Sequence, residues 1–88
     1  MPYIDQEQRR DVRNPVNRLI MELRDGEHGR NGMLNYIVTE LCVGMEPSCY
    51  DEYNDLIGVL ECVKLELYRR MVVPYEEKKR CDNGDVYD

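Results

Sequence analysis

The sequence lacks several features on which common functions depend. Its 88 residues contain neither Trp nor Phe, one histidine, His28, and no Cys-x-x-Cys pair. A zinc site is therefore not expected, and no cysteine has the histidine or cationic neighbour that would activate it as a nucleophile. A glycine-rich phosphate loop and a nucleophile–base pair are missing as well. We expect no metal, no cofactor and no catalytic activity.

Basic charge is also in short supply. Lys and Arg number 12 against 18 Asp and Glu, which gives a net charge of −6 and a pI near 4.7. Such a surface repels phosphates except at a local basic patch, so DNA and RNA are not expected partners. No stretch approaches the roughly 20 apolar residues of a membrane span, and the first residues do not resemble a signal peptide. The expected location is the cytoplasm, where the four cysteines stay reduced.

The chain is short for a protein that builds its own core. A lone domain of this size buries only about 60 to 65% of the surface that its unfolded chain exposes, so association between chains would add needed stability. All seven aromatic residues are Tyr, whose hydroxyl suits an interface or a polar pocket as well as a dry core. Residues 1–88 are expected to form one domain, with a weakly ordered segment at 1–13 and a flexible acidic tail at 81–88.

Glycine and proline divide the first part of the chain into expected helices. Asp5 with Gln8 predicts a capping box that opens a turn or two of helix. Asn14-Pro15 then supplies an N-cap and a first-turn proline for a short helix that ends at Gly26. No run of residues alternates between apolar and polar as a half-buried strand would.

Two further helices are expected in the rest of the chain. A second short helix covers residues 31–44, and a long one covers 48–73, capped by Ser48 with Asp51 and ended by Pro74. The predicted fold class is all-α, with two short amphipathic helices and one long central helix.

The long helix has an apolar arc too wide for an ordinary surface helix. At about 100° per residue, its centre holds Tyr53, Leu56, Leu60, Val63, Leu67 and Met71, flanked by Ile57, Leu65, Tyr68 and Val72. Two short helices cannot cover both sides of this arc, whereas the long helices of two chains can, which predicts a homo-oligomer built on dimers. The expected interface residues are Tyr53, Ile57, Glu61, Lys64, Leu65, Tyr68 and Val72.

Charged residues near this arc allow two interpretations. Glu61 and Lys64 lie inside the arc, where an ion pair at a subunit seam is commoner than an acid–base pair. Basic residues that follow either balance neighbouring glutamates or, together with tyrosines, hold a phosphate and stack on a base. On the second interpretation the expected ligand-binding residues are Lys64, Tyr68, Arg69, Arg70 and Tyr75.

Several segments resemble a known family. The segment 59–70, VLECVKLELYRR, is followed by Pro-Tyr-Glu at 74–76 and by NGDVY at 83–87, and residues 32–39 read GMLNYIVT. These segments, together with the initial MPYI, resemble a family of short phage and bacterial proteins of unknown function. The resemblance implies a phage or prophage origin and supplies no site residues. Small phage-encoded helical oligomers are often inhibitors or ligand sponges directed at host defence, an analogy of size and origin.

Two functions from different classes follow. The preferred one is a non-catalytic homo-oligomer that sequesters a phosphate-bearing nucleotide signal of host defence in the host cytoplasm. The alternative is a protein-interaction module that inhibits or scaffolds a host or phage protein through an acidic helical strip, formed by Asp51, Asp55 and Glu66. A sponge would release a small molecule on heating, whereas an interaction module would copurify with a protein.

Overall fold

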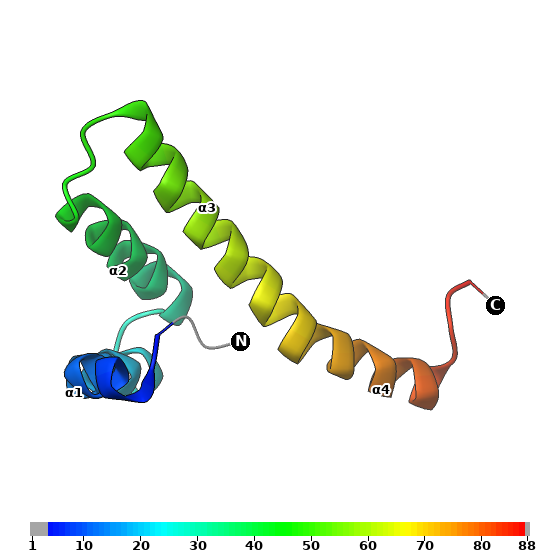
Figure 1. Cartoon of the computed structure of the whole chain (residues 1–88). Coiled ribbons are helices and arrows are strands. Elements are labelled where there is room, and N and C mark those ends of the chain that lie inside the picture. The colour runs from blue at the N-terminus through cyan, green and yellow to red at the C-terminus, as the bar shows by residue number, and fades with distance from the viewer. Residues whose placement is uncertain (1–3, 88) are drawn as a thin grey trace. The chain divides into compact units, whose positions relative to one another are not determined.

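The computed structural model describes residues 4–87 (Figure 1). Regular structure in this range is helical throughout, without a strand, which confirms the all-α class. The chain divides into two compact units, residues 1–45 and 46–88, and each unit is described by itself. Residues 1–3 and 88 lie outside the described range, and with them most of the MPYI segment and the end of the predicted tail.

The first unit begins with α1, a helix of 20 residues from Gln6 to Asp25. Its predicted capping box is confirmed, because Gln8 N–H donates to Asp5 Oδ1 at 2.8 Å and Asp5 N–H donates to Gln8 Oε1 at 2.9 Å. The predicted break before Pro15 is wrong, since α1 runs through this residue. Proline removes one backbone donor there, while the surrounding Arg, Glu, Leu and Met favour the helix and outweigh the loss.

Gly26 ends α1 and leads to the second helix. Its N–H donates to the Glu22 carbonyl at 3.0 Å, and a Cβ at this position would lie 2.4 Å from the same oxygen. Any larger residue would therefore have to shift the backbone. Helix α2 extends from Arg30 to Gly44, within one residue of the prediction.

Helices α1 and α2 contact each other within the first unit. In Figure 1, α1 is seen nearly end-on while α2 lies across the view, so the two helices cross at a large angle. The half-buried apolar side chains of this pair are Leu19, Leu23, Met33, Ile37, Val38 and Cys42. They recur at helical spacing, as expected for two amphipathic helices that share a small apolar contact.

The second unit is one long helical rod in three parts. Helix α3 extends from Tyr50 to Leu67, a π-helical segment, η1, from Tyr68 to Val72, and α4 from Val73 to Asn83. The prediction that Pro74 ends this helix is wrong. The predicted Ser48 cap is also wrong, because Cys49 occupies the N-cap position without a side-chain hydrogen bond, and Ser48 N–H donates to Glu52 Oε2 at 2.8 Å.

The π-helical segment explains how the rod passes Pro74. Proline has no N–H, and in an α-helix its ring would clash with the carbonyl of Arg70. In η1 the hydrogen bond instead spans five residues, from Val73 N–H to the Tyr68 carbonyl, which widens the turn and makes room for the ring. Figure 1 shows the ribbon changing direction between α3 and α4, as proline and π turns commonly cause.

The wider turn also rotates the residues that follow it. One extra residue in a turn shifts their facing by about 100° relative to an uninterrupted α-helix. Met71, predicted at the centre of the apolar arc, is 63% exposed, whereas Val72, predicted on the flank, is half-buried. The arc predicted for an uninterrupted α-helix therefore cannot be carried past Tyr68.

The described residues contain no buried core. None of them, apolar or polar, is buried, and large apolar side chains are exposed on every helix. On the long helix, the best-covered of the predicted arc residues are Leu56 and Val72, which are half-buried, and Leu60, which is 37% exposed. The apolar side chains that were expected to pack against a neighbour therefore lie largely open to solvent.

Candidate functional site

The candidate site lies at the junction of α3, η1 and α4. It comprises the predicted ligand-binding residues, which are Lys64, Tyr68, Arg69, Arg70 and Tyr75. We call this set the junction cluster. Its members come from a single helical rod, so the turns of that rod, including the wide π turn, set which of them face the same way.

Glu66 is the centre of charge in this region. Arg69 Nη2 donates to both carboxylate oxygens of Glu66, at 2.9 and 2.8 Å, and Arg70 Nε lies 2.8 Å from Glu66 Oε1. The hydrogen bond from Arg69 lowers the pKa of Glu66, the charges of Arg69 and Arg70 lower it further, and desolvation opposes them. Only 26% of the Glu66 side chain is exposed, although the sequence places this residue on the acidic strip with Asp51 and Asp55.

The two guanidiniums have one carboxylate between them. Their side chains remain 67% and 61% exposed, which leaves donors of both directed to solvent. An Arg pair around a single carboxylate carries a net positive charge and can accept a further anion, for which the planar fork of Arg is well suited. This is the one part of the junction cluster whose geometry fits phosphate binding.

Lys64 is engaged differently. Its Nζ lies 2.9 Å from Glu61 Oε1, with both side chains more than half exposed, as a helical i, i+3 pair. An exposed pair of this type contributes little to stability. The arrangement is an ordinary surface ion pair. No other described residue of the junction cluster forms an ion pair with Glu61 or Lys64.

The two tyrosines of the cluster are separated by the π turn. Tyr68 is 55% exposed and Tyr75 60% exposed. The Nζ of Lys79 lies 5.6 Å from the centroid of the Tyr75 ring, within cation–π range. One face of the Tyr75 ring is thus used by its own helix, whereas more than half of Tyr68 is open to solvent.

The predicted interface residues lie mostly open along the same rod. Tyr53, Ile57, Leu65 and Tyr68 are each more than half exposed, and Val72 is half-buried. Glu61 and Lys64 form the ion pair described above. This face is therefore available to a partner.

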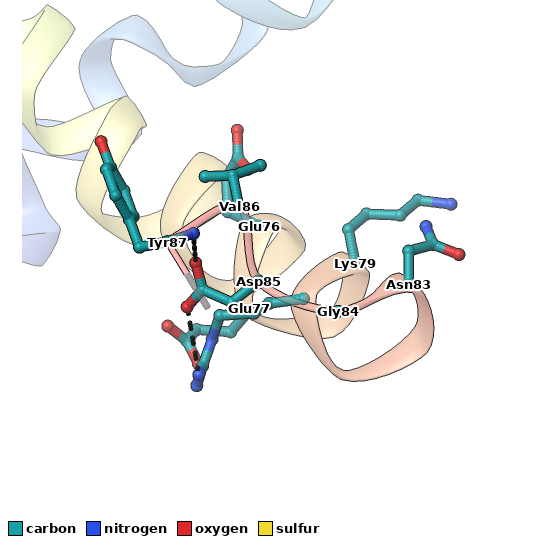
Figure 2. A pocket seen from close by; sticks show the side chains of 9 residues that line it. Glu76, Glu77, Lys79, Asn83, Gly84, Asp85, Val86 and Tyr87 are labelled. Atoms are coloured by element: carbon teal, nitrogen blue, oxygen red, sulfur yellow. Dashed lines mark hydrogen bonds and ion pairs between the residues drawn. The ribbon is translucent and has the colours of Figure 1, made fainter.

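A hollow at the end of α4 was not predicted from the sequence. It measures about 410 Å³ and is lined by Glu76, Glu77, Lys79, Arg80, Asn83, Gly84, Asp85, Val86 and Tyr87. Gly84, with φ of 89°, turns the chain back beside the helix. Figure 2 shows Lys79 and Asn83 on one side of this turn and Tyr87 on the other.

The polar groups of the hollow pair with one another. Arg80 Nη2 lies 2.7 Å from Glu77 Oε2, and Arg80 Nη1 lies 3.6 Å from Asp85 Oδ2. The hydrogen bond to Glu77 raises the pKa of Arg80. Tyr87 N–H donates to Asp85 Oδ1 at 2.9 Å, which closes the turn. A ligand would have to compete with these bonds, so the hollow is a weaker candidate than the arginine pair.

The described part of the chain also lacks a metal-binding cluster and a membrane-spanning helix. Residues 4–87 contain no group of three or more His, Cys, Asp or Glu that could hold a metal ion. The four cysteines are free, with Cys42 half-buried and the others exposed. No described helix is both long enough and apolar enough to cross a membrane.

Comparison with known proteins places the chain in a family. The model of a family described as a domain of unknown function, DUF6899, matches residues 1–86. Because the match covers nearly the whole length, the chain belongs to this family. No curated protein and no solved structure matches the chain.

Proposed function

We propose that this member of the DUF6899 family is a non-catalytic homo-oligomeric binding protein whose long helix pairs with that of another copy. The observation that carries the proposal is the absence of any buried residue from positions 4–87, while Ile57, Leu65 and Leu67 are each more than half exposed. Soluble monomers seldom leave a contiguous apolar patch of more than a few hundred Å² in water. A partner surface is the simplest remedy.

The energetics point the same way. An isolated helix is marginally stable in water, and most helical stability in proteins comes from packing of the apolar face. Burying one large apolar side chain stabilises a structure by about 1.5 to 3 kcal/mol. Pairing two long helices would bury several such side chains on each, a stabilising contribution that a single chain lacks.

The lengths of the helices support pairing between chains. The rod from Tyr50 to Asn83 is about 51 Å long, whereas α2, with 15 residues, is about 22 Å long. A helix of the length of α2 could cover less than half of such a rod, wherever it lay.

Sedimentation velocity at micromolar concentration tests the proposal. The wild-type chain should sediment as a dimer or a larger oligomer, and Ile57→Asp should dissociate it by placing a charge in the seam. Ile57 is 64% exposed within the chain, so this change should leave the helical content of the monomer nearly intact. Asn17→Asp, at an exposed position of α1 outside the seam, adds the same charge as the matched control and should leave the oligomer unchanged. A wild-type monomer would refute the proposal.

A second candidate function is sequestration of a phosphate-bearing small molecule, such as a nucleotide signal of host defence. The observation in its favour is the arginine pair, in which Arg69 and Arg70 share the single carboxylate of Glu66. Local π-helical turns are frequent at functional sites, and η1 contains Tyr68 and both arginines. A phage origin, as the resemblance of the sequence implies, would suit such a role.

Thermal melting with a panel of nucleotides, cyclic dinucleotides and ADP-ribose tests this candidate. A ligand at a hundredfold excess over its Kd stabilises the folded state by about 2.7 kcal/mol, which raises the melting temperature by several degrees. Arg70→Ala should abolish the shift without changing the melting temperature of the free protein. Arg80→Ala removes a similar charge outside the cluster and should retain the shift.

A flat response to the whole panel would favour the alternative, a module that binds a host or phage protein. In that case heating the purified protein should release no small molecule. The acidic strip of Asp51, Asp55 and Glu66 would then be the first surface to mutate.

A further inference from the structure

The long helix separates its charges by sign along its length. Between Tyr50 and Val63 it carries four acidic side chains and no Lys or Arg, the acidic ones being Asp51, Glu52, Asp55 and Glu61. Between Lys64 and Asn83 it carries four acidic side chains against six basic ones, which are Lys64, Arg69, Arg70, Lys78, Lys79 and Arg80. The rod is thus negative in its first half and positive in its second.

Local effects account for only part of this pattern. The helix dipole favours acids in the first turn and bases in the last turn, but its influence does not extend to Asp55 or to the arginines near the middle. Pairs within the rod neutralise Lys64 and Arg80. Among residues 4–87, Asp51, Asp55 and Lys78 form no ion pair, so charge of both signs is left for a partner.

We infer that two copies of the chain pair their long helices in antiparallel orientation. This inference rests on the self-association proposed above and adds the direction of pairing. An antiparallel pair sets the acidic half of each rod against the basic half of its partner at both ends. A parallel pair would place acid beside acid and base beside base, and like charges facing each other weaken an interface.

The charge pattern also indicates the register of the pair. Residues 51–61 of one protomer oppose residues 69–80 of its partner when the two rods cross near residue 65. In this register Cys49 of one protomer lies near the same level as the partner's Cys81. Both thiols are free and exposed, so they can carry labels. Within one chain the two positions are about 48 Å apart along the rod.

Distances between spin labels test the orientation. Two single-cysteine chains are needed, one retaining Cys49 and the other Cys81, with the remaining cysteines replaced by Ser. In antiparallel dimers formed from both chains, labels on Cys49 and Cys81 should lie roughly 10 to 25 Å apart, given the usual spacing between packed helices and the length of the labels. Dimers labelled twice at Cys49, or twice at Cys81, should show separations of about 45 to 50 Å.

Short same-site distances in these dimers would overturn the antiparallel orientation and leave self-association intact. A labelled chain that sediments as a monomer, like its unlabelled parent, would instead overturn the proposed self-association. The two failures are therefore distinguishable.

A charge swap gives an independent readout. One chain carries Asp51→Lys and Asp55→Lys, and the other carries Lys78→Glu and Lys79→Glu. In antiparallel pairs each variant alone faces like charges, so its dimer should be roughly tenfold weaker than wild type at low salt. Mixing the two variants restores opposite charges at both ends and should restore wild-type affinity. Variants that each associate as tightly as wild type would contradict the inference, because a parallel pair repels equally in all three.

Discussion

Glu66 illustrates how a single residue organises its surroundings. Its carboxylate accepts two hydrogen bonds from Arg69 and forms an ion pair with Arg70. These interactions lower the pKa of Glu66. Ordinary helix spacing predicts these i, i+3 and i, i+4 contacts, as it predicts the pair of Glu61 with Lys64. The small exposure of Glu66 could not be predicted, since the sequence shows only that it lies away from the apolar arc.

Replacing Glu66 by Gln should reduce the pH dependence of stability in acid. Because folding lowers the pKa of Glu66 below its ordinary value of 4.5, the ionised form stabilises the folded chain above that pH. The stabilisation is lost as the pH falls below 4.5 and the carboxylate takes up a proton. Between about pH 6 and about pH 3, the melting temperature of wild type should therefore fall more steeply than that of Glu66→Gln.

Arg69→Ala is a companion variant for the same measurement. It removes the largest cause of the lowered pKa of Glu66. The slope of its melting temperature against pH should therefore lie between those of wild type and Glu66→Gln. Equal slopes for all three chains would show that Glu66 does not couple folding to pH.

At the scale of elements, the sequence predicted where helices exist better than where they end. The capping box of Asp5 with Gln8 and the limits of α2 were predicted because they depend on local contacts. The sequence predicted a helix break at Pro15 and a helix end at Pro74, and at both positions the helical structure continues. A proline ends a helix only when nothing beyond it favours continuation, and here helix-forming residues follow each one.

The π turn had no direct signal in the sequence. It arises because the rod continues past Pro74 and must make room for the proline ring, a consequence of the continuation itself. For the same reason the apolar arc, which assumes an uninterrupted α-helix, cannot be carried past Tyr68. The three members of the junction cluster beyond Tyr68 therefore could not be placed from helical periodicity alone.

Replacing Pro74 by Ala should convert the π turn into a regular α-helix. Alanine restores the missing N–H and removes the clash with the Arg70 carbonyl. The Val73 N–H should then donate to the Arg69 carbonyl instead of the Tyr68 carbonyl, which NMR scalar couplings across hydrogen bonds can detect. Helical stability should rise, since an interior proline costs about 3 kcal/mol relative to alanine. Retention of the Val73–Tyr68 bond would show that the π turn does not depend on proline.

At the scale of the whole molecule, the described residues form helices without a core of their own. From the sequence we expected only that the apolar arc of the long helix would exceed what two shorter helices can cover. The absence of any buried residue from positions 4–87 goes beyond that expectation. We propose that folding and association are coupled, so that the partner supplies the contacts that one chain lacks. The partner could not be predicted from one sequence, because its contact surfaces come together only in the assembled state.

The concentration dependence of thermal unfolding tests this central proposal most directly. If association stabilises the helices, the melting temperature followed by circular dichroism should rise with protein concentration, because an oligomer that binds only folded chains shifts the equilibrium by mass action. Over a hundredfold range from about 1 μM, the rise should amount to several degrees. A melting temperature that stays constant over this range, with a monomer present throughout, would contradict the account.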